Sequence, residues 1–479
     1  MMQILIAGVA LPFLGAAMTL LLPQRPSRYV CLASAVLSFF AILAALVQFV
    51  LDGRHEFTQP LVSVDGVVLL GFTVDNLSLL IASAVSLVGL LVCLYSLSYM
   101  SMANKEHPDT GRSRYFFFMQ VFVGAMAGLV FSSTLTGELF FFEITGVCSW
   151  GLIGYYETPK ALNGAAKALV VTHIASLGLY FAAAILFANT GSFSLSALSA
   201  VSAPAKTAIM LGILFAAWGK SAQFPLHTWL PGAMEAPTPV SAYLHAGSMV
   251  NIGVYIFARA IQSAGQTPHV VGVIGVVAAS VTLIYAFAMY FPQKDIKRLL
   301  VYSTIAQLSY IFLALSLSIF GSPLAFKGGV AHIFNHAFAK SLFFLVSGAL
   351  SFTLGTRMMP LLRGLLTHLP LVGVAFGVAA LAIGGAPPMN LFFSKFAIFA
   401  GGFEAARLFP LLLIPVLIAI AESVGTFAWF LKKFGFAAFG EPSPTVAAAT
   451  PLPLGMKVAL AALIVLTLCS GFVAPAWLG

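Results

Sequence analysis

The segment HIFNHAFAKSLFFLVSGAL places three ionisable side chains, His332, His336 and Lys340, at intervals of four residues within an apolar stretch. Residues four apart lie on one side of an α-helix, so these side chains would form a row about 12 Å long. Histidine titrates near neutral pH and can accept a proton on one ring nitrogen while releasing one from the other. The row, joined by water and Asn335, therefore predicts a path for protons.

The same HxxxH spacing also occurs in metal sites and would suit paired haem ligands. The segment lacks the glutamate of an HExxH motif, and no third ligand lies close to it in the sequence. The four cysteines of the chain form no CxxC pair, so neither a zinc site nor an iron–sulfur cluster is indicated. We expect no metal and no cofactor in this chain.

Four more ionisable side chains lie in other apolar runs: Glu143 in FFFEITGVCSW, Lys220 in FAAWGKSAQ, His245 in SAYLHAGSMV and Lys395 in NLFFSKF. A charge at the bilayer centre costs about 2.5–3.5 kcal/mol on insertion scales, which favours a functional role over decoration. We expect Glu143 to pair with Lys220, either as a switch or as a static ion pair. His245 would pass protons inward from Lys220, or would instead hydrogen-bond to a carbonyl. His173 is also in a span, without an assigned role.

The composition indicates a membrane protein. Of 479 residues, 60% are hydrophobic and 8% are charged, whereas soluble domains carry about 25% charged residues. The formal charge of +9 does not indicate nucleic-acid binding, because the basic residues lie mostly in short loops and not in a basic stripe. The chain is predicted to be an all-α polytopic membrane protein.

About 20 apolar residues span a bilayer as a helix, and fourteen such runs are predicted. They lie near residues 3–22, 29–51, 75–100, 115–133, 135–156, 162–189, 207–224, 239–262, 269–291, 296–318, 325–354, 370–400, 410–431 and 454–476. The first run lacks a basic n-region and a cleavage site, so it is expected to be retained. The segment 61–75 is too short to span and alternates around Asp65 and Gly66, which predicts an extramembrane hairpin.

Most loop lysines and arginines fall in the odd-numbered connections between these spans, among them Arg112, Lys294 and Lys297. The positive-inside rule places those connections in the cytoplasm. Both termini are then expected on the periplasmic side of a bacterial inner membrane. Lys294 and Lys297 are interpreted as anchors of this kind, and Glu235 as a cap or loop anchor near the cytoplasmic mouth.

Two predicted spans contain prolines close to a lysine, in WGKSAQFPLHTWLP and in GGAPPMNLFFSKF. Proline interrupts the helical ladder, which a membrane tolerates only where protein or a wet cavity satisfies the freed groups. The broken spans are the seventh and the twelfth. Because the offset of five is odd, the second unit must run inverted relative to the first, which is typical of ion pathways.

The whole chain, residues 1–479, is therefore expected to form one integral membrane domain. Spans 1–3 occupy residues 1–110, and spans 4–8 form the first inverted repeat at 111–265. Spans 9–13 form the second repeat at 266–435, and the last span lies in 436–479.

Several motifs carry a resemblance to a known family. KSAQFPLHTWLPGAMEAPTPVSAYLHAGSMV, together with FFFEITGVCSWGLIGYY, DIKRLLVYSTIAQLSY, HIFNHAFAKSLFF and PPMNLFFSK, resembles the antiporter-like membrane subunits. These subunits occur in respiratory NADH:quinone oxidoreductase, Mrp-type sodium/proton antiporters and membrane-bound nickel–iron hydrogenases. The phrases KEHPDTGRSRYFFF and FAAWGKSAQ are most similar to the hydrogenase-4 branch, which belongs to formate-hydrogenlyase-like complexes.

The resemblance implies a proton-translocating subunit with a hydrated polar axis and no redox centre of its own. The implied roles are a coupling pair for Glu143 and Lys220, a central relay for Lys340 with its two histidines, and an exit-side lysine for Lys395. The partners implied are other membrane-arm subunits and a peripheral hydrogenase module that holds the nickel–iron centre and iron–sulfur clusters. The alternatives are an Mrp-like cation/proton antiporter subunit that moves Na⁺ as well as protons, an NADH:quinone oxidoreductase subunit, or an arm that does not pump.

Three residues depart from the family pattern. Asn251 stands where several relatives carry a lysine, Ser176 where some carry an aspartate, and Leu391 where a glycine is expected. We therefore expect His173 to lack an acidic partner. The inward route beside His245 is expected to differ from that of relatives.

Overall fold

The computed structural model describes residues 1–479, apart from the side chain of Gln24. The N-terminal elements are α1 (Met2–Leu21), α2 (Gln24–Leu51), β1 (Phe57–Val64), β2 (Val67–Val74) and α3 (Asn76–Tyr99). The next elements are α4 (Ser113–Phe131), α5 (Leu135–Ile153), η1 (Gly154–Tyr156), α6 (Pro159–Thr190), η2 (Leu195–Ala200), α7 (Ala203–Lys220), η3 (Leu226–Trp229), η4 (Gly232–Glu235), α8 (Thr238–Ala242), η5 (Tyr243–Gly247) and α9 (Met249–Ala264). The last are α10 (His269–Ala288), α11 (Ile296–Ser318), α12 (Pro323–Leu354), η6 (Met359–Leu361), α13 (Leu365–His368), α14 (Pro370–Gly384), α15 (Asn390–Leu408), η7 (Pro410–Leu412), α16 (Leu413–Ala438), α17 (Pro444–Ala447) and α18 (Leu454–Leu478).

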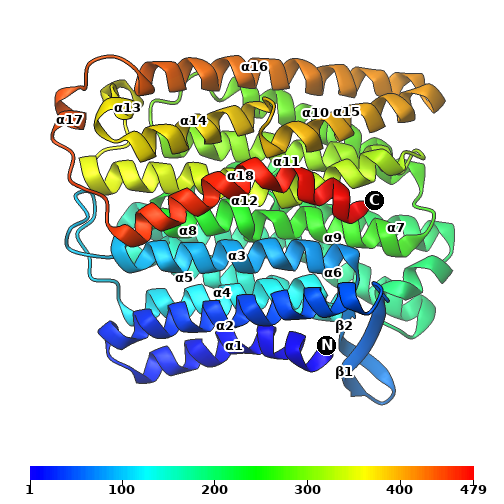
Figure 1. Cartoon of the computed structure of the whole chain (residues 1–479). Coiled ribbons are helices and arrows are strands. Elements are labelled where there is room, and N and C mark those ends of the chain that lie inside the picture. The colour runs from blue at the N-terminus through cyan, green and yellow to red at the C-terminus, as the bar shows by residue number, and fades with distance from the viewer.

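The long helices run side by side across the molecule, as a multi-pass membrane protein requires (Figure 1). Twelve helical segments are long and apolar enough to span a bilayer. The two other predicted spans are the broken ones, α7 with η3 and η4, and α14 with α15. The predicted fold class is therefore confirmed.

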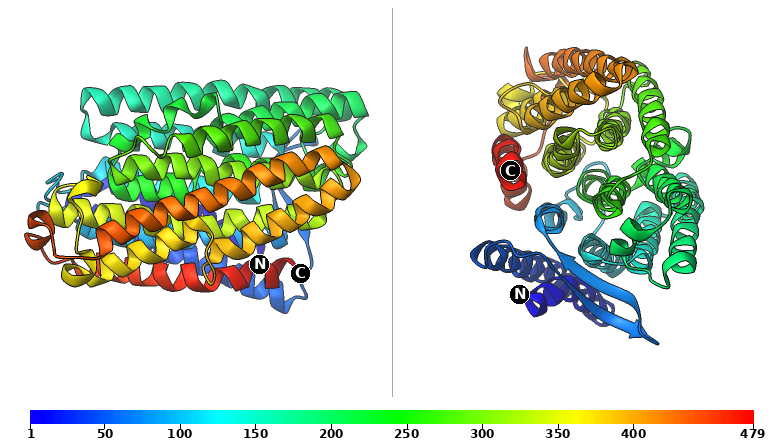
Figure 2. Two further views of the ribbon diagram at one scale, coloured as in Figure 1. Left: turned by 90° about the horizontal axis from the view of Figure 1, so that it is seen from above. Right: turned by 90° about the vertical axis from the view of Figure 1, so that its right-hand side faces the viewer.

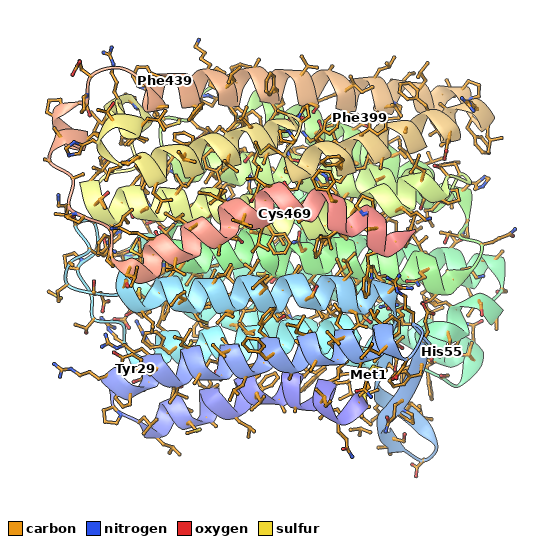
Figure 3. The ribbon with its side chains drawn as sticks, in the orientation of Figure 1. Met1, Tyr29, His55, Phe399, Phe439 and Cys469 are labelled. Atoms are coloured by element: carbon orange, nitrogen blue, oxygen red, sulfur yellow. The ribbon has the colours of Figure 1, made fainter. Side chains whose placement is uncertain are left out.

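The two ends of the bundle differ. Both termini lie at the end from which the β1–β2 hairpin projects, here called the hairpin end (Figure 1). Tyr29 and Phe439 lie at the opposite end from His55, as Figure 3 shows. The hairpin confirms the prediction for 61–75, although it starts at Phe57. Asp65 and Gly66 have φ of 49° and 80°, as a two-residue type I′ turn requires.

The helix order supports an inverted repeat. Five spans run from α4 to α9 and five from α10 to α16, and the broken span is the fourth in each set. α4 runs toward the hairpin end, whereas α10 starts there and runs away from it. The limits of the repeats within the chain remain predictions.

α12 is the centre of the bundle and is buried almost along its whole length. It packs against α3, α8 and η5 on one side and against α11, α14, α15 and α18 on the other. The end-on view in Figure 2 places α1 and α2 (blue) and α16 (orange) at opposite margins of the molecule. Groups on α12 can therefore meet groups from both repeats.

A third interruption, which the sequence analysis did not predict, divides the eighth span. The π-helical turn η5 separates α8 from α9, and Ser248 after it has φ −132° and ψ −107°. π-helical turns leave the regular ladder and occur often at functional sites. The span contains no internal proline at this point, so the break lacked the signal that marked the other two.

α6 and α7 approach so closely that their contact depends on glycine. A methyl group added to Gly212 would lie 2.6 Å from the Gly178 carbonyl oxygen, and one on Gly178 would overlap the Gly212 carbonyl oxygen. Small residues of this kind allow membrane helices to pack backbone to backbone.

Gly178→Ala is expected to lower the thermal stability of the purified chain, since overpacking of this kind costs about 1–3 kcal/mol. The melting temperature in detergent measures the effect. Gly435→Ala is the matched control, because an added methyl group there meets no atom within 4 Å. Equal melting of the two variants would contradict the close approach.

Candidate functional site

Lys220 is the last residue of α7 and is completely buried at the point where that helix breaks. Its Nζ donates a hydrogen bond of 2.9 Å to the Phe142 carbonyl oxygen on α5. The same atom lies 4.0 Å from the centre of the Phe142 ring, a cation–π distance. The lysine is thus held by α5 at mid-span.

Glu143 follows Phe142 on α5 but does not contact Lys220 directly. Its Oε2 lies 3.1 Å from Nδ1 of His173 on α6, and its Oε1 has no hydrogen-bond partner among the described residues. Neighbouring residues on a helix point about 100° apart, so Lys220 meets the face of Phe142 while Glu143 turns toward α6. Glu143 therefore makes its direct contact with His173, while its charge remains close enough to act on Lys220.

His173 consequently has an acidic partner, contrary to the expectation drawn from Ser176. The Ser176 hydroxyl donates to the His173 carbonyl oxygen at 2.7 Å and is buried. The His173 side chain is 58% exposed and that of Glu143 27% exposed. Around them, α5 and α6 expose Phe140, Val147, Ile174 and other apolar side chains. A polar pair therefore lies on an otherwise apolar outer surface.

The predicted row on α12 is present and fully buried. The rings of His332 and His336 have centroids 6.5 Å apart and an interplanar angle of 20°. His332 is hydrogen-bonded on both sides, to Ser394 Oγ at 2.9 Å and to Gln307 Oε1 at 3.1 Å. Neither nitrogen of His336 has a partner within the described chain, and Lys340 Nζ donates to Ser303 Oγ.

Asn335 does not join this row. Its side-chain amide donates to the Asn390 carbonyl oxygen at 3.0 Å, and the Asn390 amide donates back to the Asn335 carbonyl oxygen at 2.8 Å. These bonds secure the start of α15, beside the break, to α12. Leu391 is fully buried at that start.

α11 supplies polar groups that the sequence analysis missed. Ser303 and Gln307 bond to Lys340 and His332, and Tyr310 lies beside Lys395. The signal was available in DIKRLLVYSTIAQLSY, because residues 303, 307 and 310 recur at helical spacing within an apolar span. A polar stripe on one helix face indicates the side that meets the pathway.

Lys395 resembles Lys220 in its surroundings. Its Nζ donates to the Ile383 carbonyl oxygen at 3.2 Å, next to the end of α14, and to Ser423 Oγ at 3.1 Å. It also lies 4.6 Å from the centre of the Tyr310 ring. In both broken spans, a buried lysine is held by a backbone carbonyl and an aromatic face.

Glu422 on α16 is the carboxylate of the second repeat, and it is 5% exposed. It accepts hydrogen bonds from Tyr310, from Tyr290 at 3.3 Å and from Thr426 at 2.5 Å. Its charge is close enough to act on Lys395. Glu422 therefore lies beside Lys395, a placement that the sequence could not assign.

His245 lies inside η5, is fully buried and stacks on Phe344 of α12 with centroids 5.0 Å apart. Its two ring nitrogens find no partner in the described structure, so the carbonyl-bonded alternative is not observed. Lys340 and Lys297 are the charges that act on it. Asn251 donates to the Ala246 carbonyl oxygen at 2.5 Å and so satisfies a group that the π-helical turn frees.

Gln223 connects the first repeat to the second. It lies just beyond Lys220, and its Oε1 accepts from Ser309 on α11 at 2.8 Å. Its amide donates to the Ile305 carbonyl oxygen at 3.4 Å. Polar contacts therefore continue from the break in α7 to the face of α11 that also carries Gln307.

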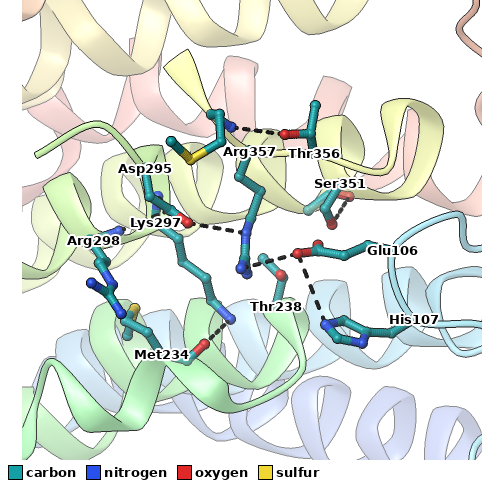
Figure 4. A network of polar contacts seen from close by, with 12 residues as sticks. Glu106, His107, Met234, Thr238, Asp295, Lys297, Arg298, Ser351, Thr356 and Arg357 are labelled. Atoms are coloured by element: carbon teal, nitrogen blue, oxygen red, sulfur yellow. Dashed lines mark hydrogen bonds and ion pairs between the residues drawn. The ribbon is translucent and has the colours of Figure 1, made fainter. Parts of the chain in front are cut away.

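A second polar network closes the end opposite the hairpin (Figure 4). Arg357 Nη2 lies 3.0 Å from Glu106 Oε1, and its Nε lies 3.6 Å from Asp295 Oδ2. Lys297 is 1% exposed and donates to the Met234 and Ala236 carbonyl oxygens at 2.8 and 2.6 Å. Lys297 is therefore a buried clamp between α11 and η4, and its interpretation as a surface anchor is wrong.

A cleft of about 310 Å³ opens beside this network. Glu235, Asp295 and Lys297 are among its lining residues, so Glu235 does lie at a mouth of the bundle. Among the described residues, no group of three or more His, Cys, Asp or Glu side chains is placed to hold a metal ion.

The chain matches a family model described as NADH:quinone oxidoreductase/Mrp antiporter, TM, over residues 132–421. A second model, the N-terminus of NADH-ubiquinone oxidoreductase (complex I) chain 5, matches residues 63–116. The first match covers more than half of the chain and includes every site residue described above from Lys220 to Lys395. The chain belongs to the NADH:quinone oxidoreductase/Mrp antiporter family of membrane subunits.

Individual relatives agree with this assignment. The chain is 36% identical over 346 residues to the chloroplastic NAD(P)H-quinone oxidoreductase subunit 5 of Carpenteria californica, covering 68% of this chain and 45% of the relative. For the same subunit of Zygnema circumcarinatum, identity is 31% over 438 residues, with coverage of 85% and 59%. The chain thus spans about half the length of the curated relatives it matches.

Two solved structures share the fold. A chain of the Mrp complex from Dietzia sp. DQ12-45-1b superposes with a TM-score of 0.86 and 28% identity, covering 99% of this chain and 51% of that one. A chain of the archaeal membrane-bound sulfane sulfur reductase also gives 0.86, with coverage of 99% and 96%. Its 22% identity supports the likeness in fold alone.

The end network predicts a pH dependence of stability. Burial lowers the pKa of His107, which stacks on Tyr156, and the nearby Arg357 charge lowers it further, although Glu106 opposes this. The unfolded chain then binds more protons than the folded chain, so stability should fall as the pH drops from about 7 to 5. His107→Gln should flatten this slope in thermal melts at several pH values. The exposed His55→Gln variant, at the other end, should retain it. A slope that His107→Gln leaves unchanged would contradict the assignment.

Proposed function

We propose that the chain is an antiporter-like, proton-translocating subunit of a larger membrane complex. The observation that carries this proposal is the series of ionisable side chains buried inside the helical bundle. It comprises Lys220, His245, Lys340, His336, His332 and Lys395. Isolated charges at this depth are costly, and a connected set is the usual sign of an ion or proton pathway.

Polar groups on α11 and α15 lie beside several members of the series. Gln223 and Ser309 lead from the break after Lys220 to α11, and Ser303 and Gln307 on α11 lead to Lys340 and His332. His332 then contacts Ser394, the neighbour of Lys395 on α15. His336 lies between His332 and Lys340 along α12, and neither of its ring nitrogens has a hydrogen-bond partner among the described residues. Either nitrogen of its ring can therefore take up or release a proton.

The exposed Glu143–His173 pair supports a neighbouring membrane subunit. A carboxylate and an imidazole facing lipid would be poorly solvated, whereas a polar contact from another chain would satisfy them. We propose that this face of α5 and α6 docks against another membrane-arm subunit. Glu143 would then sense the neighbour while Phe142, the adjacent residue, holds Lys220.

For the finer identity, we propose a subunit similar to component D of bacterial hydrogenase-4, in a formate-hydrogenlyase-like complex. The motifs that favour it are KEHPDTGRSRYFFF and FAAWGKSAQ. In that case a peripheral hydrogenase module would hold the nickel–iron centre and the iron–sulfur clusters. The relatives support equally an NADH:quinone oxidoreductase membrane subunit or an Mrp-like cation/proton antiporter subunit.

We further propose a bacterial inner membrane as the location, with the hairpin end facing the periplasm. The connections at the opposite end carry most of the loop lysines and arginines, which favours the cytoplasm for that end.

Lys220→Ala and Lys340→Ala are each expected to reduce proton movement to background, because each removes a buried protonatable group from the proposed pathway. The complex is purified through this chain, reconstituted into vesicles and followed with a pH-sensitive dye. Lys433→Ala on α16, whose lysine lies over Trp429, is the control and should retain the flux. Undiminished flux in both pathway variants would overturn the proton-translocating role.

Affinity purification from native membranes is expected to recover nickel–iron hydrogenase subunits with this chain. Mass spectrometry of the co-purifying proteins measures this outcome. Recovery of small Mrp-type proteins, or of NADH dehydrogenase subunits, would select one of the alternatives instead.

A further inference from the structure

Glu138 is a buried carboxylate outside the series described above. It lies in the first turn of α5, at the hairpin end, and is 1% exposed. Neither carboxylate oxygen has a hydrogen-bond partner in the described part of the chain. A buried ionised carboxylate without partners is costly, so such a group persists only if it is neutral or binds a ligand.

Arg259 on α9, whose charge acts on Glu138, lies at the centre of a tight polar cluster. Both terminal nitrogens of the guanidinium contact the Asp75 carboxylate, one of them at 3.0 Å. Arg259 also donates to the Tyr255 hydroxyl at 2.8 Å, and Tyr255 donates to the Val130 carbonyl oxygen at 2.5 Å. Asp75 in turn caps α3 by accepting from the Ser78 backbone amide at 2.7 Å.

This cluster leaves one donor free. Arg259 Nε is buried and finds no acceptor among the described atoms. Arg259 is also the charged group that acts on Glu138. Since Asp75 already neutralises Arg259, an ionised Glu138 would add an uncompensated negative charge to this buried region.

The other elements packed against α5 bring no further charge to this end. Along their described lengths, α4, α6 and β2 carry no ionised side chain near the hairpin, and α9 contributes Arg259 and Tyr255. The positive Arg259 also makes a metal cation a poor ligand for this site. The proton is the ligand that suits it.

An exposed carboxylate, that of Glu56, is influenced by the charges of this cluster. Glu56 precedes β1, and its partial burial and the negative charge of Asp75 raise its pKa, while Arg259 opposes this. Both members of the same Asp75–Arg259 pair therefore influence this exposed carboxylate.

We propose that Glu138 is a proton-binding site at the hairpin end of the first repeat, where it exchanges its proton with the aqueous phase. On release, the O–H bond of the Glu138 acid breaks and the proton passes to water. The new carboxylate is stabilised by the positive charge of Arg259, and rebinding reverses these steps. The role of Glu138 in transport rests on the proposed function, whereas its protonated state does not.

The test is infrared spectroscopy of the purified full-length chain in lipid. The expected spectrum at neutral pH contains the carbonyl stretch of a protonated carboxylic acid, and Glu138→Gln should abolish that band. Glu157→Gln, at the far end of the same span, is the matched control and should leave the band in place. A band that is absent from the wild-type protein, or unchanged in Glu138→Gln, overturns the proposal.

Asp75→Asn tests the link to Arg259 and retains the oxygen that caps α3. With Asp75 neutral, Arg259 would be available to Glu138, so the band should disappear at a lower pH than in the wild-type protein. An unchanged titration would show that Arg259 does not govern the site. A band that responds to Na⁺ at constant pH would identify a metal cation and not a proton as the ligand.

The two proposals can fail separately. A Glu138-dependent band in a complex that moves no protons would leave this site standing and overturn the proposed function. Proton flux in reconstituted vesicles, with no such band in the spectrum, would support the proposed function and overturn the Glu138 site.

Discussion

The structure depends on the cost of placing polar groups where water is scarce. A regular helix satisfies its own backbone and can cross a bilayer, but a buried lysine needs acceptors in addition. Ile383 offers its carbonyl to Lys395 beside the α14–α15 break, and Phe142 on the intact α5 offers its carbonyl to Lys220 where α7 ends. Each of these two buried lysines therefore lies at a helix break and is held by a backbone carbonyl.

This constraint explains why much of the fold could be predicted from sequence. Apolar runs define the spans, and proline next to a buried lysine marks a break with few alternatives. The break at His245 could not be found in this way, because a π-helical turn needs no proline and depends on the packing of η5 against α12. Lys297 was misinterpreted for a related reason. Its position next to Arg298 is typical of a loop anchor, and only the fold shows the two carbonyls that bind it.

The residues of the candidate site could be predicted from the sequence, but the contacts between them could not. His332, His336 and Lys340 share a helix, so their relation follows from helical spacing alone. Glu143, His173 and Lys220 come from three helices, and their contacts depend on rotations about each helix axis that the sequence does not specify. Glu138 was missed because GELFFFE places a second glutamate near a span end, where acidic residues are common at helix starts.

The link between the repeats has a consequence for the flow of charge. The groups that join the two halves along α11 include the amide of Gln223. An amide orients and bridges neighbouring groups but does not hold an extra proton near neutral pH. The Gln223 amide can therefore hold neighbouring hydroxyl groups in line between the two halves, but it cannot itself store a proton.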